Sequence, residues 1–333
     1  MPIAIDVMGG DFYPHNPVLG AIRAVNERKV DVVLVGDEKA IKGELDLLRF
    51  NRKKVDIAHA SQVVEMDESV ASALRAKKES SIRVCFDLHK RGDVQGVVSA
   101  GNSGAMLAVG HFVLKTISGV DRPCISALLP SLKGKVLLVD AGANIESTPN
   151  HLSQFAILGS LYMEHIYSIT SPRIGLLNIG SEDGKGDERS KKAFSLLRGS
   201  SLNFVGNIEG REFFDGDIDV VVSDGFSGNI LLKSVQGAAD FMRAVLRQES
   251  QRTWLDRLGA LFMRSALERL DRRTSYSEFG GAPLLGLRGN CVLCHGRSNP
   301  EALLHGIGFA KWASDTRLVE RMEEKMVDFM ATN

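Results

Sequence analysis

Short apolar runs alternate with longer amphipathic segments along most of the chain. The runs contain mainly Val, Ile and Leu without clean alternation, so we expect strands with helices covering both faces. Nine strands are predicted: residues 3–7, 31–36, 55–60, 96–100, 125–130, 135–140, 173–179, 202–208 and 219–224. Strands that alternate with helices in this way predict an α/β fold with a mostly parallel sheet.

The segments between the strands include several with helix signals. Residues 17–27 predict a helix in which Asn16 can act as the cap and Pro17 fits the first helical position. Further helices are expected at residues 69–91, 106–115 and 230–247. Repeats and long linkers rich in Pro, Gly or Ser are absent from the sequence. We therefore expect residues 1–333 to form a single catalytic domain.

Five predicted strands end in Gly, Asn, Asp and Ser. These strand ends lie at residues 5–11, 98–105, 139–144, 177–188 and 223–229. Ligands of open parallel sheets bind beyond the carboxyl ends of the strands, so five such ends predict one shared cleft. Taken singly, each segment is equally consistent with an ordinary turn, because turns favour Gly and Asn.

Two of these strand ends have the form of an anion site. "GNSGAM" and "GFSGN" each precede a predicted helix, whose first N–H groups point toward a ligand, and Ser103 and Ser227 add hydroxyl donors. The nucleotide signatures G-x-x-x-x-G-K-[ST] and strand-linked G-x-G-x-x-G are missing; "GSEDGKG" has the wrong spacing. The anion is therefore expected to be a small phosphate.

Composition and charge narrow the class of protein. The 333 residues include 41 basic and 41 acidic side chains, so the chain has no net positive charge that would attract nucleic acid. The start has no basic region followed by an apolar run, and no stretch reaches the roughly 20 apolar residues of a membrane span. We expect a cytoplasmic protein with reduced cysteines.

The histidines and cysteines offer few candidates for chemistry. "CVLCH", residues 291–295, matches a haem-attachment motif, but a second zinc-ligand pair is missing and the run also fits a short buried strand. His111 lies in an apolar helix and is expected in the core or an interface. A G-x-S-x-G nucleophile motif is missing as well. We expect neither a metal nor a cofactor.

Ordered motifs along residues 3–308 then suggest a family. They are "IAIDVMGGD", "VVSAGNSGA", "LLVDAGAN", "GLLNIGSEDGKGDE", "VGNIEGRE", "VVVSDGFSGNILLK" and "GGAPLLG" followed by "HGRS". In this order they resemble the bacterial phosphate acyltransferases of phospholipid synthesis. Two departures are Val7, where Ala is expected, and Ser275 before Tyr276, where an acidic residue is common.

The resemblance implies a fold, an activity and partners. The fold would be a three-layer α/β/α structure related to phosphotransacetylases and isocitrate dehydrogenases. The reaction would move a long-chain acyl group from the thioester of acyl carrier protein to inorganic phosphate. A membrane glycerol-3-phosphate acyltransferase would accept the product. The resemblance also implies a homodimer and peripheral attachment to the inner face of the cell membrane.

The residues fit this chemistry without a covalent intermediate, because phosphate is an anionic nucleophile and a thiol of pKa about 8.5 is a fair leaving group. We expect Lys185 to neutralise charge, unless it is a solvated loop lysine, and Asn229 to donate an amide N–H, unless it caps its helix. The predicted phosphate-binding residues are Gly101, Asn102, Ser103, Gly104, Ser227 and Gly228. Acidic and amide side chains expected behind them, orienting the site, are Asp140, Asn144 and Asp224.

Residues 240–275 depart from the α/β pattern and predict a helical segment. Apolar side chains recur at spacings of three and four, and residues 243–273 hold eight arginines against four acids. Such a segment fits a membrane surface, an acidic carrier protein or a dimer core. The residues expected to make this contact are Trp254, Leu258, Leu261, Phe262, Arg257 and Arg264.

Three rival functions remain open at this point. A short-chain phosphotransacetylase that uses acyl-coenzyme A would not need the arginine-rich amphipathic segment. A dehydrogenase would need a dinucleotide site and usually a carboxylate cluster for a metal, which the sequence does not display. A non-catalytic scaffold associated with the membrane would have no reason to retain the glycine loops and Lys185.

Overall fold

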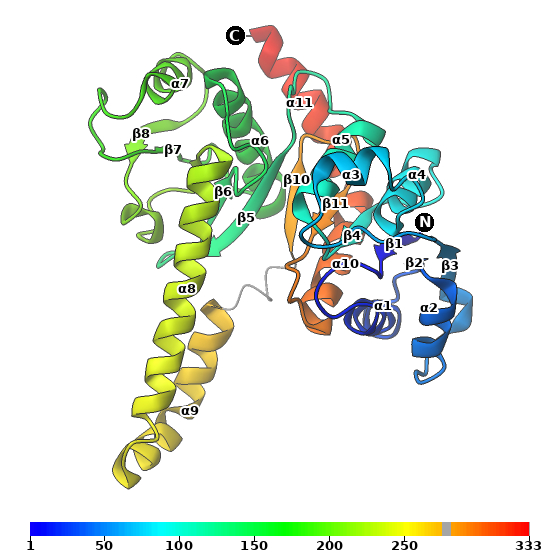
Figure 1. The fold of residues 1–333 in the computed structure, drawn as a ribbon. Helices are drawn as coiled ribbons and strands as arrows, with labels where there is room; N and C mark the ends of the chain where they lie inside the picture. The colour runs from blue at the N-terminus through cyan, green and yellow to red at the C-terminus, as the bar shows by residue number, and fades with distance from the viewer. Residues whose placement is uncertain (275–280, 333) are drawn as a thin grey trace.

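One mixed sheet forms the centre of the molecule. The structure is a computed structural model that describes residues 1–274 and 281–332. Its eleven strands follow the order β3-β2-β1-β4-β11-β10-β5-β6-β9-β7-β8 (Figure 1). The strands are β1 (Ile3–Asp6), β2 (Val32–Gly36), β3 (Val55–His59), β4 (Val97–Ser99), β5 (Cys124–Pro130), β6 (Lys135–Val139), β7 (Ile174–Leu177), β8 (Phe204–Ile208), β9 (Val220–Val222), β10 (Ala282–Leu285) and β11 (Cys291–Leu293).

All nine predicted strands form, and the predicted buried strand in "GNCVLCHG" is β11. The sheet is mostly parallel, as expected: among the described residues, the antiparallel strand pairs are β5 with β6, β10 with β5 and β10 with β11. The strand β10 was not predicted. It holds Pro283 between glycine-rich turns, a composition that reads as a loop.

Eleven α-helices surround the sheet within the described residues. They are α1 (His15–Arg28), α2 (Glu38–Leu45), α3 (Val70–Arg75), α4 (Ser81–Arg91), α5 (Ser103–Leu114), α6 (Pro149–Tyr167), α7 (Glu188–Arg198), α8 (Gly225–Glu249), α9 (Trp254–Thr274), α10 (Pro300–Asp315) and α11 (Leu318–Thr332). Two short 3₁₀ turns lie at Arg52–Lys54 and Glu212–Phe214. Helices and sheet form the predicted α/β/α layers.

Two helix predictions were wrong in detail. The segment 69–91 is split into α3 and α4, because Ser80 forms a bridge with Gln62 that takes the chain out of helical geometry. Asn16 does not cap α1, which already begins at His15 after Pro14. Instead, the Asn16 side-chain amide donates a hydrogen bond to the Ser298 carbonyl, 3.0 Å away.

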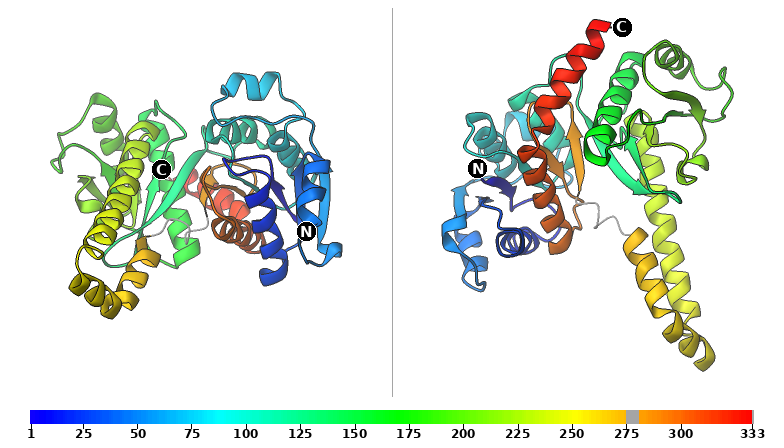
Figure 2. Two further views of the ribbon diagram at one scale, coloured as in Figure 1. Left: turned by 60° about the horizontal axis from the view of Figure 1, so that its bottom comes forward. Right: turned by 180° about the vertical axis from the view of Figure 1, so that it is seen from behind.

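The helices pack on the sheet through three apolar clusters. One cluster joins α1 and α10 to the outer half of the sheet around β1, and a second joins α3, α4 and α5 to its opposite face. The third joins α6, α7 and α11 to the half that contains β6, β7 and β9 (Figure 2). The carboxyl ends of β1, β4 and β6 thereby border a central cleft.

The helices α8 and α9 form a hairpin that projects from this body (Figures 1 and 2). The buried residues of α8 are Gly225 and Gly228, both in its first turn. Residues 240–274 of the predicted helical segment belong to this hairpin, except for a short connection between the helices. Ser275 and Tyr276 lie outside the described residues. Across residues 1–274 and 281–332, each helix is too short or too polar to span a bilayer.

Candidate active site in the central cleft

A cavity of about 460 Å³ opens between the strand ends and α8. Its volume lies within the range of small-molecule sites, about 300–1,000 Å³. Four of the five predicted strand ends contribute to its lining, through Asp11, Gly101 with Ser103, Gly142, and Asn229. The predicted shared cleft is therefore present for these four segments.

The first two of these strand ends touch each other through glycines. A Cβ added to Gly9 would lie 2.7 Å from the Gly101 nitrogen, so the contact requires glycine at residue 9. Behind it, the Ser99 hydroxyl donates to the Asp6 carboxylate at 2.6 Å and accepts from the Gly101 N–H at 3.0 Å. Burial raises the pKa of Asp6, partly offset by its hydrogen bond from Ser99. These bonds fix the position of the backbone at Gly101.

The N-terminus of α5 presents donors to the cavity. The first amides of a helix have no intrahelical partner, so the N–H groups of Ser103 and Gly104 are suited to an anion. The Asn102 side chain instead accepts from the Ala105 N–H and donates to three carbonyls, including that of Glu68 at 2.9 Å. Thus Ser103 lines the cavity, while Asn102 anchors the loop before α3.

The N-terminus of α8 is engaged within the protein instead. Asp224 accepts the Ser227 N–H at 2.8 Å and its hydroxyl at 3.1 Å, and it pairs with Arg189 at 3.0 Å. A Cβ added to Gly228 would lie 1.9 Å from the Asp140 carbonyl oxygen, so this glycine allows close packing. Phosphate binding by Ser227 and Gly228 stays a prediction that these contacts do not favour.

Asp140 and Asn144 organise the backbone behind the cleft. The buried Asp140 carboxylate accepts N–H groups from Ile125, Gly142, Ala143 and Asn144. The Asn144 side chain donates to the same carboxylate at 2.9 Å. Burial raises the pKa of Asp140, and these hydrogen bonds work in the opposite direction. Neither side chain lines the cavity, nor does that of Asp224, so the orienting role of these three residues stays a prediction.

Asn229 stands at the edge of the cavity on α8. Its side chain lies against Gly142, whose φ is +137° and where an added Cβ would be 3.4 Å from the Asn229 Cβ. No hydrogen bond engages its amide within the described residues, so the group is available to a ligand. Lys233 and Gln236 follow at helical spacing and line the same cavity. The spacing of four between Asn229 and Lys233 was a sequence signal for Lys233.

Lys185 is not brought to the cavity. Its ammonium lies 3.9 Å from a Glu182 carboxylate oxygen, and about half of its side chain is exposed. The backbone of its loop is fastened by Asn178, which donates to the Lys185 carbonyl at 3.0 Å, and by Asn207, which donates to the Glu182 carbonyl. The segment 177–188 contributes no residue to the lining. A catalytic role for Lys185 stays a prediction.

The turn after β11 supplies groups that sequence analysis missed. His295, Arg297 and Ser298 line the cavity, and the Arg297 N–H donates to His295 Nδ1 at 3.1 Å. Burial, and then the charge of Lys233, lowers the pKa of His295 below its usual value. Neither Lys233 nor Arg297 is ion-paired with a described carboxylate. The motif "HGRS" was the available signal, but no role was inferred from it.

Cysteines do not supply a nucleophile here. All four are free and buried. Cys294 lines the cavity, but burial raises its pKa to about 12, so it stays a thiol at neutral pH. Groups of His, Cys, Asp and Glu able to hold a metal ion are missing among the described residues.

The remaining wall of the cavity is apolar. It is built from β5, α8 and β11, with side chains Ile125, Ala127, Leu129, Leu232 and Leu293. One cavity thus combines helix amides, an amide side chain and two cations with a surface that suits a hydrocarbon chain.

Comparison with known proteins identifies the family. The profile of a family described as "Fatty acid synthesis protein" matches residues 1–321. The phosphate acyltransferase of Pelobacter propionicus is 46% identical over 326 residues, which cover 98% of this chain and 94% of the relative. The phosphate acyltransferase of Geobacter sulfurreducens is 44% identical over 336 residues, which cover 99% and 96%.

Solved structures agree on the fold at low identity. A phosphotransacetylase from Streptococcus pyogenes aligns with a TM-score of 0.63 and 18% identity, covering 96% of this chain and 94% of the other. The predicted relationship to the phosphotransacetylase fold is confirmed. The identity is too low to carry substrate or activity across, whereas the sequence relatives cover nearly the whole chain. The chain therefore belongs to the fatty acid synthesis protein family, together with the phosphate acyltransferases, and is an acyltransferase.

Proposed function

We propose that the chain transfers a long-chain acyl group from the thioester of acyl carrier protein to inorganic phosphate. The products would be an acyl phosphate and the free thiol of the carrier. The observation that carries this proposal is the union, in one cavity, of anion donors at α5 with an apolar wall along β5. Phosphate needs the donors, and a fatty acyl chain needs the wall.

Phosphate would bind between the α5 N-terminus and the cations. Ser103, which lines the cavity, would donate its N–H and hydroxyl, joined by the next helix N–H, that of Gly104, while Lys233 and Arg297 would supply positive charge. The Ser99 hydroxyl holds the Gly101 backbone in place, and this would fix the position of the following α5 amides relative to phosphate. A phosphate oxygen held in this way faces a thioester whose acyl chain lies along the apolar wall.

The reaction would proceed by direct addition and elimination. A phosphate oxygen forms a bond to the thioester carbonyl carbon, and the carbonyl electrons move to its oxygen. When the oxyanion collapses, the carbon–sulfur bond breaks and the thiolate leaves, to be protonated because its thiol has a pKa of about 8.5. The Asn229 amide, which lies at the cavity edge, would donate to the oxyanion.

Lys185 remains a proposed cation for this reaction. A movement of the 177–188 segment would be needed to bring its ammonium from Glu182 to the phosphate. The test is the turnover of a folded Lys185→Ala variant. A strongly reduced rate would support this role, and a near-normal rate would remove Lys185 from the site.

The α8–α9 hairpin would bring the enzyme to its partners. Its exposed apolar side chains include those predicted to make contact: Trp254, Leu258, Leu261 and Phe262. Arg257 and Arg264 lie among them, and Arg264 pairs with Glu268 at 2.9 Å. An apolar surface with cationic neighbours suits the inner face of a cell membrane or an acidic carrier. A second copy of the chain, in a homodimer, would cover the same surface.

Peripheral attachment would also release the acyl phosphate product close to the membrane. Acyl phosphate combines a hydrocarbon chain with a reactive anhydride, so delivery at the membrane favours a membrane-bound glycerol-3-phosphate acyltransferase as the next enzyme. We therefore expect the chain to act in the cytoplasm, at the inner face of the membrane, in the synthesis of phosphatidic acid.

The activity is tested by trapping its product. The protein is incubated with long-chain acyl carrier protein thioester and phosphate, and hydroxylamine converts any acyl phosphate to a hydroxamate. Hydroxylamine also cleaves the thioester slowly, so a sample without enzyme is subtracted. We expect the remaining hydroxamate and free carrier thiol in equal amounts, both dependent on phosphate. Thiol release without hydroxamate, or independent of phosphate, would contradict the proposal. Preference for short acyl-coenzyme A donors in a chain-length series would favour a phosphotransacetylase instead.

A further inference from the structure

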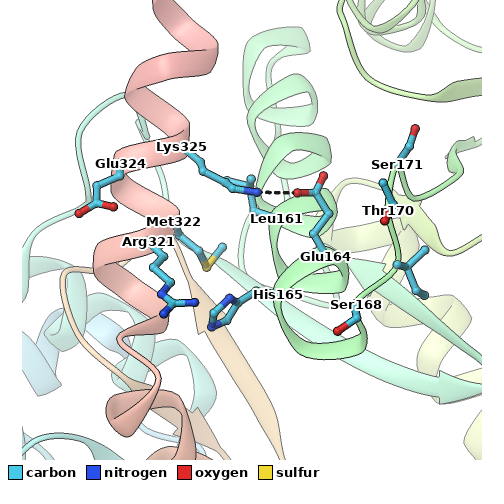
Figure 3. Close-up of a pocket in the computed structure, with 11 residues that line it drawn as sticks. Leu161, Glu164, His165, Ser168, Thr170, Ser171, Arg321, Met322, Glu324 and Lys325 are labelled. Carbon is cyan, nitrogen blue, oxygen red and sulfur yellow. Dashed lines mark hydrogen bonds and ion pairs between the residues drawn. The ribbon is translucent and has the colours of Figure 1, made fainter.

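A second cavity lies between α6 and α11, separate from the central cleft. Its volume is about 640 Å³, and none of its lining residues is shared with the central cavity. Figure 3 shows its lining side chains on the two helices, among them Lys325 and Glu164 on facing surfaces, and on the turn after α6. A volume of this size again falls within the range of ligand sites, about 300–1,000 Å³.

The inner part of this cavity is apolar. Leu161 of α6 and Met322 of α11 are buried and belong to the same apolar cluster, and Ile169 packs against it. Figure 3 shows Met322 directed from α11 toward α6. An apolar part of a ligand would therefore meet hydrocarbon and thioether groups in this region.

Two acidic and two basic side chains line the cavity, and one of the basic side chains is not ion-paired. Lys325 and Glu164 pair across the cavity at 2.7 Å and neutralise each other (Figure 3). Glu324 also lines the cavity, but its carboxylate forms no ion pair with Arg321. Arg321 lines the cavity and has no ion-pair partner within the part of the chain that the structure describes.

A buried polar atom on α6 also lacks a partner. The Nε2 atom of His165 is inaccessible to solvent and makes no hydrogen bond. Its ring lies 6.1 Å from that of Trp312, centroid to centroid, and faces α11. Burial lowers the pKa of His165, and the charges of Arg321 and Lys325 act in the same direction. With its proton on Nε2, the neutral ring is an unsatisfied donor beside the cavity.

We propose that the α6–α11 cavity binds a small amphipathic anion. Its carboxylate or phosphate head would contact the Arg321 guanidinium, next to the His165 ring, and its apolar body would lie on Leu161 and Met322. A guanidinium binds such oxyanions through two parallel hydrogen bonds. This ligand site is additional to the proposed acyl transfer and does not depend on it.

Two features define the charge of the ligand. The cavity lies at the carboxyl end of α6, whose partial negative charge disfavours an anion, whereas the Arg321 contact is direct and charge-assisted and favours one. A cation would have to approach the same unpaired guanidinium. The hydroxyls of Ser168, Thr170 and Ser171, in the turn after α6, line one side of the cavity and can donate to further head-group oxygens.

The experiment titrates the full chain with n-octanoate and with n-octyl phosphate by calorimetry. Inorganic phosphate alone and n-octanol are the comparison ligands. Lys233→Gln reports any binding in the central cleft. Arg321→Gln removes the proposed head-group contact, and Arg317→Gln is the matched control, because it removes an exposed arginine one turn away that does not line the cavity.

We expect octanoate or octyl phosphate to bind, the tighter of the two identifying the head group. Arg321→Gln should weaken that binding by about tenfold or more, since a hydrogen bond to a charged group is lost. Arg317→Gln should leave it unchanged, and Lys233→Gln should remove only a binding component that belongs to the central cleft. In NMR spectra of histidine-labelled protein, the His165 signals should move with saturation of the same site.

Three results would overturn the proposal. The first is no saturable binding of either anion to the wild-type chain. The second is equal binding by Arg321→Gln and wild type, or by n-octanol and the anions. The third is a wild-type titration that leaves the His165 signals in place, since binding would then occur elsewhere.

Discussion

The α/β body and the α8–α9 hairpin use the same apolar residue types in opposite ways. In the body, Leu137 and Leu138 of β6 are fully buried. In the hairpin, 72% of Trp254 and 81% of Phe262 is exposed. Apolar burial stabilises the body within one chain. An exposed apolar surface of this kind instead marks a site of contact with something outside the chain.

Some glycines of the body are packed more closely than those of the hairpin. Gly228, where α8 meets the body, is packed against the Asp140 carbonyl. At Gly237, farther along α8, and at Gly259 in α9, an added Cβ would meet no group within 4 Å beyond the backbone of its own helix and its chain neighbours. Contacts made by the chain itself therefore constrain the body, while the hairpin is free to accommodate an external partner.

The largest effect is expected for catalysis in the body. Asn229→Ala should lower turnover by about 100- to 1,000-fold, as is typical for the loss of one oxyanion donor. The matched control is Gln248→Ala, which removes an exposed amide from the far part of the same helix. Steady-state rates with acyl carrier protein thioester, on proteins of unchanged melting temperature, measure the difference. Equal rates for the two variants would contradict the assignment of Asn229.

Next in size is the effect of charges on the hairpin surface. The double variant Leu258→Glu, Leu261→Glu should lower partition onto anionic liposomes by more than about tenfold, because burying one leucine side chain is worth about 1.5–3 kcal/mol. Co-sedimentation measures the partition. As a control, Leu132→Glu changes an exposed leucine of the body. Undiminished partition of the double variant would exclude insertion by this surface.

Glycine substitutions should change stability in opposite directions. Gly228→Ala should lower the free energy of unfolding by about 1–3 kcal/mol, because the added methyl group meets backbone. Gly237→Ala should raise it by roughly 0.5–1 kcal/mol, because alanine is the better helix former and has open space here. Chemical denaturation measures both. The same sign for the two variants would show that the regions do not differ as described.

The smallest effect concerns an ion pair in the body that supports the loop before α3. Glu68 bonds to Lys77 and Ser72, and the hydrogen bond from Lys77 lowers the pKa of Glu68 to about 2. Because the pKa is lowered in the folded state, the ionised Glu68 carboxylate stabilises the fold fully at pH values above its ordinary pKa of 4.5. This contribution is lost as the pH falls toward 2. The melting temperature of Glu68→Gln should therefore be lower than that of the wild type at pH 7, and the difference should disappear near pH 2. A gap independent of pH would rule out this ion pair as its cause.

Sequence patterns predicted the body far better than the site. Continuous runs of Val, Ile and Leu identified the predicted strands, because buried parallel strands need such runs. The strand β10 was missed, since Pro283 and its glycines resemble a loop and the strand exists through pairing with β5 and β11. The break near Ser80 likewise depends on Gln62, which lies far away in sequence.

Within the site, the strand-end rule located Ser103 and Asn229 at one cavity. It missed Lys233, because this residue lies one helical turn beyond the strand end that contains Asn229. It also missed Arg297, which follows the short strand β11. It also favoured Lys185, which the structure pairs with Glu182 instead. The α6–α11 cavity had no sequence signal, since it arises from the packing of two helices far apart in the chain.

The most direct test of the central claim is a crystal structure of the protein soaked with inorganic phosphate. We predict phosphate in the central cavity, within hydrogen-bond distance of the Ser103 N–H and with Asn229 and Lys233 beside it. Phosphate bound at another place in the molecule, with these groups unoccupied, would contradict the account.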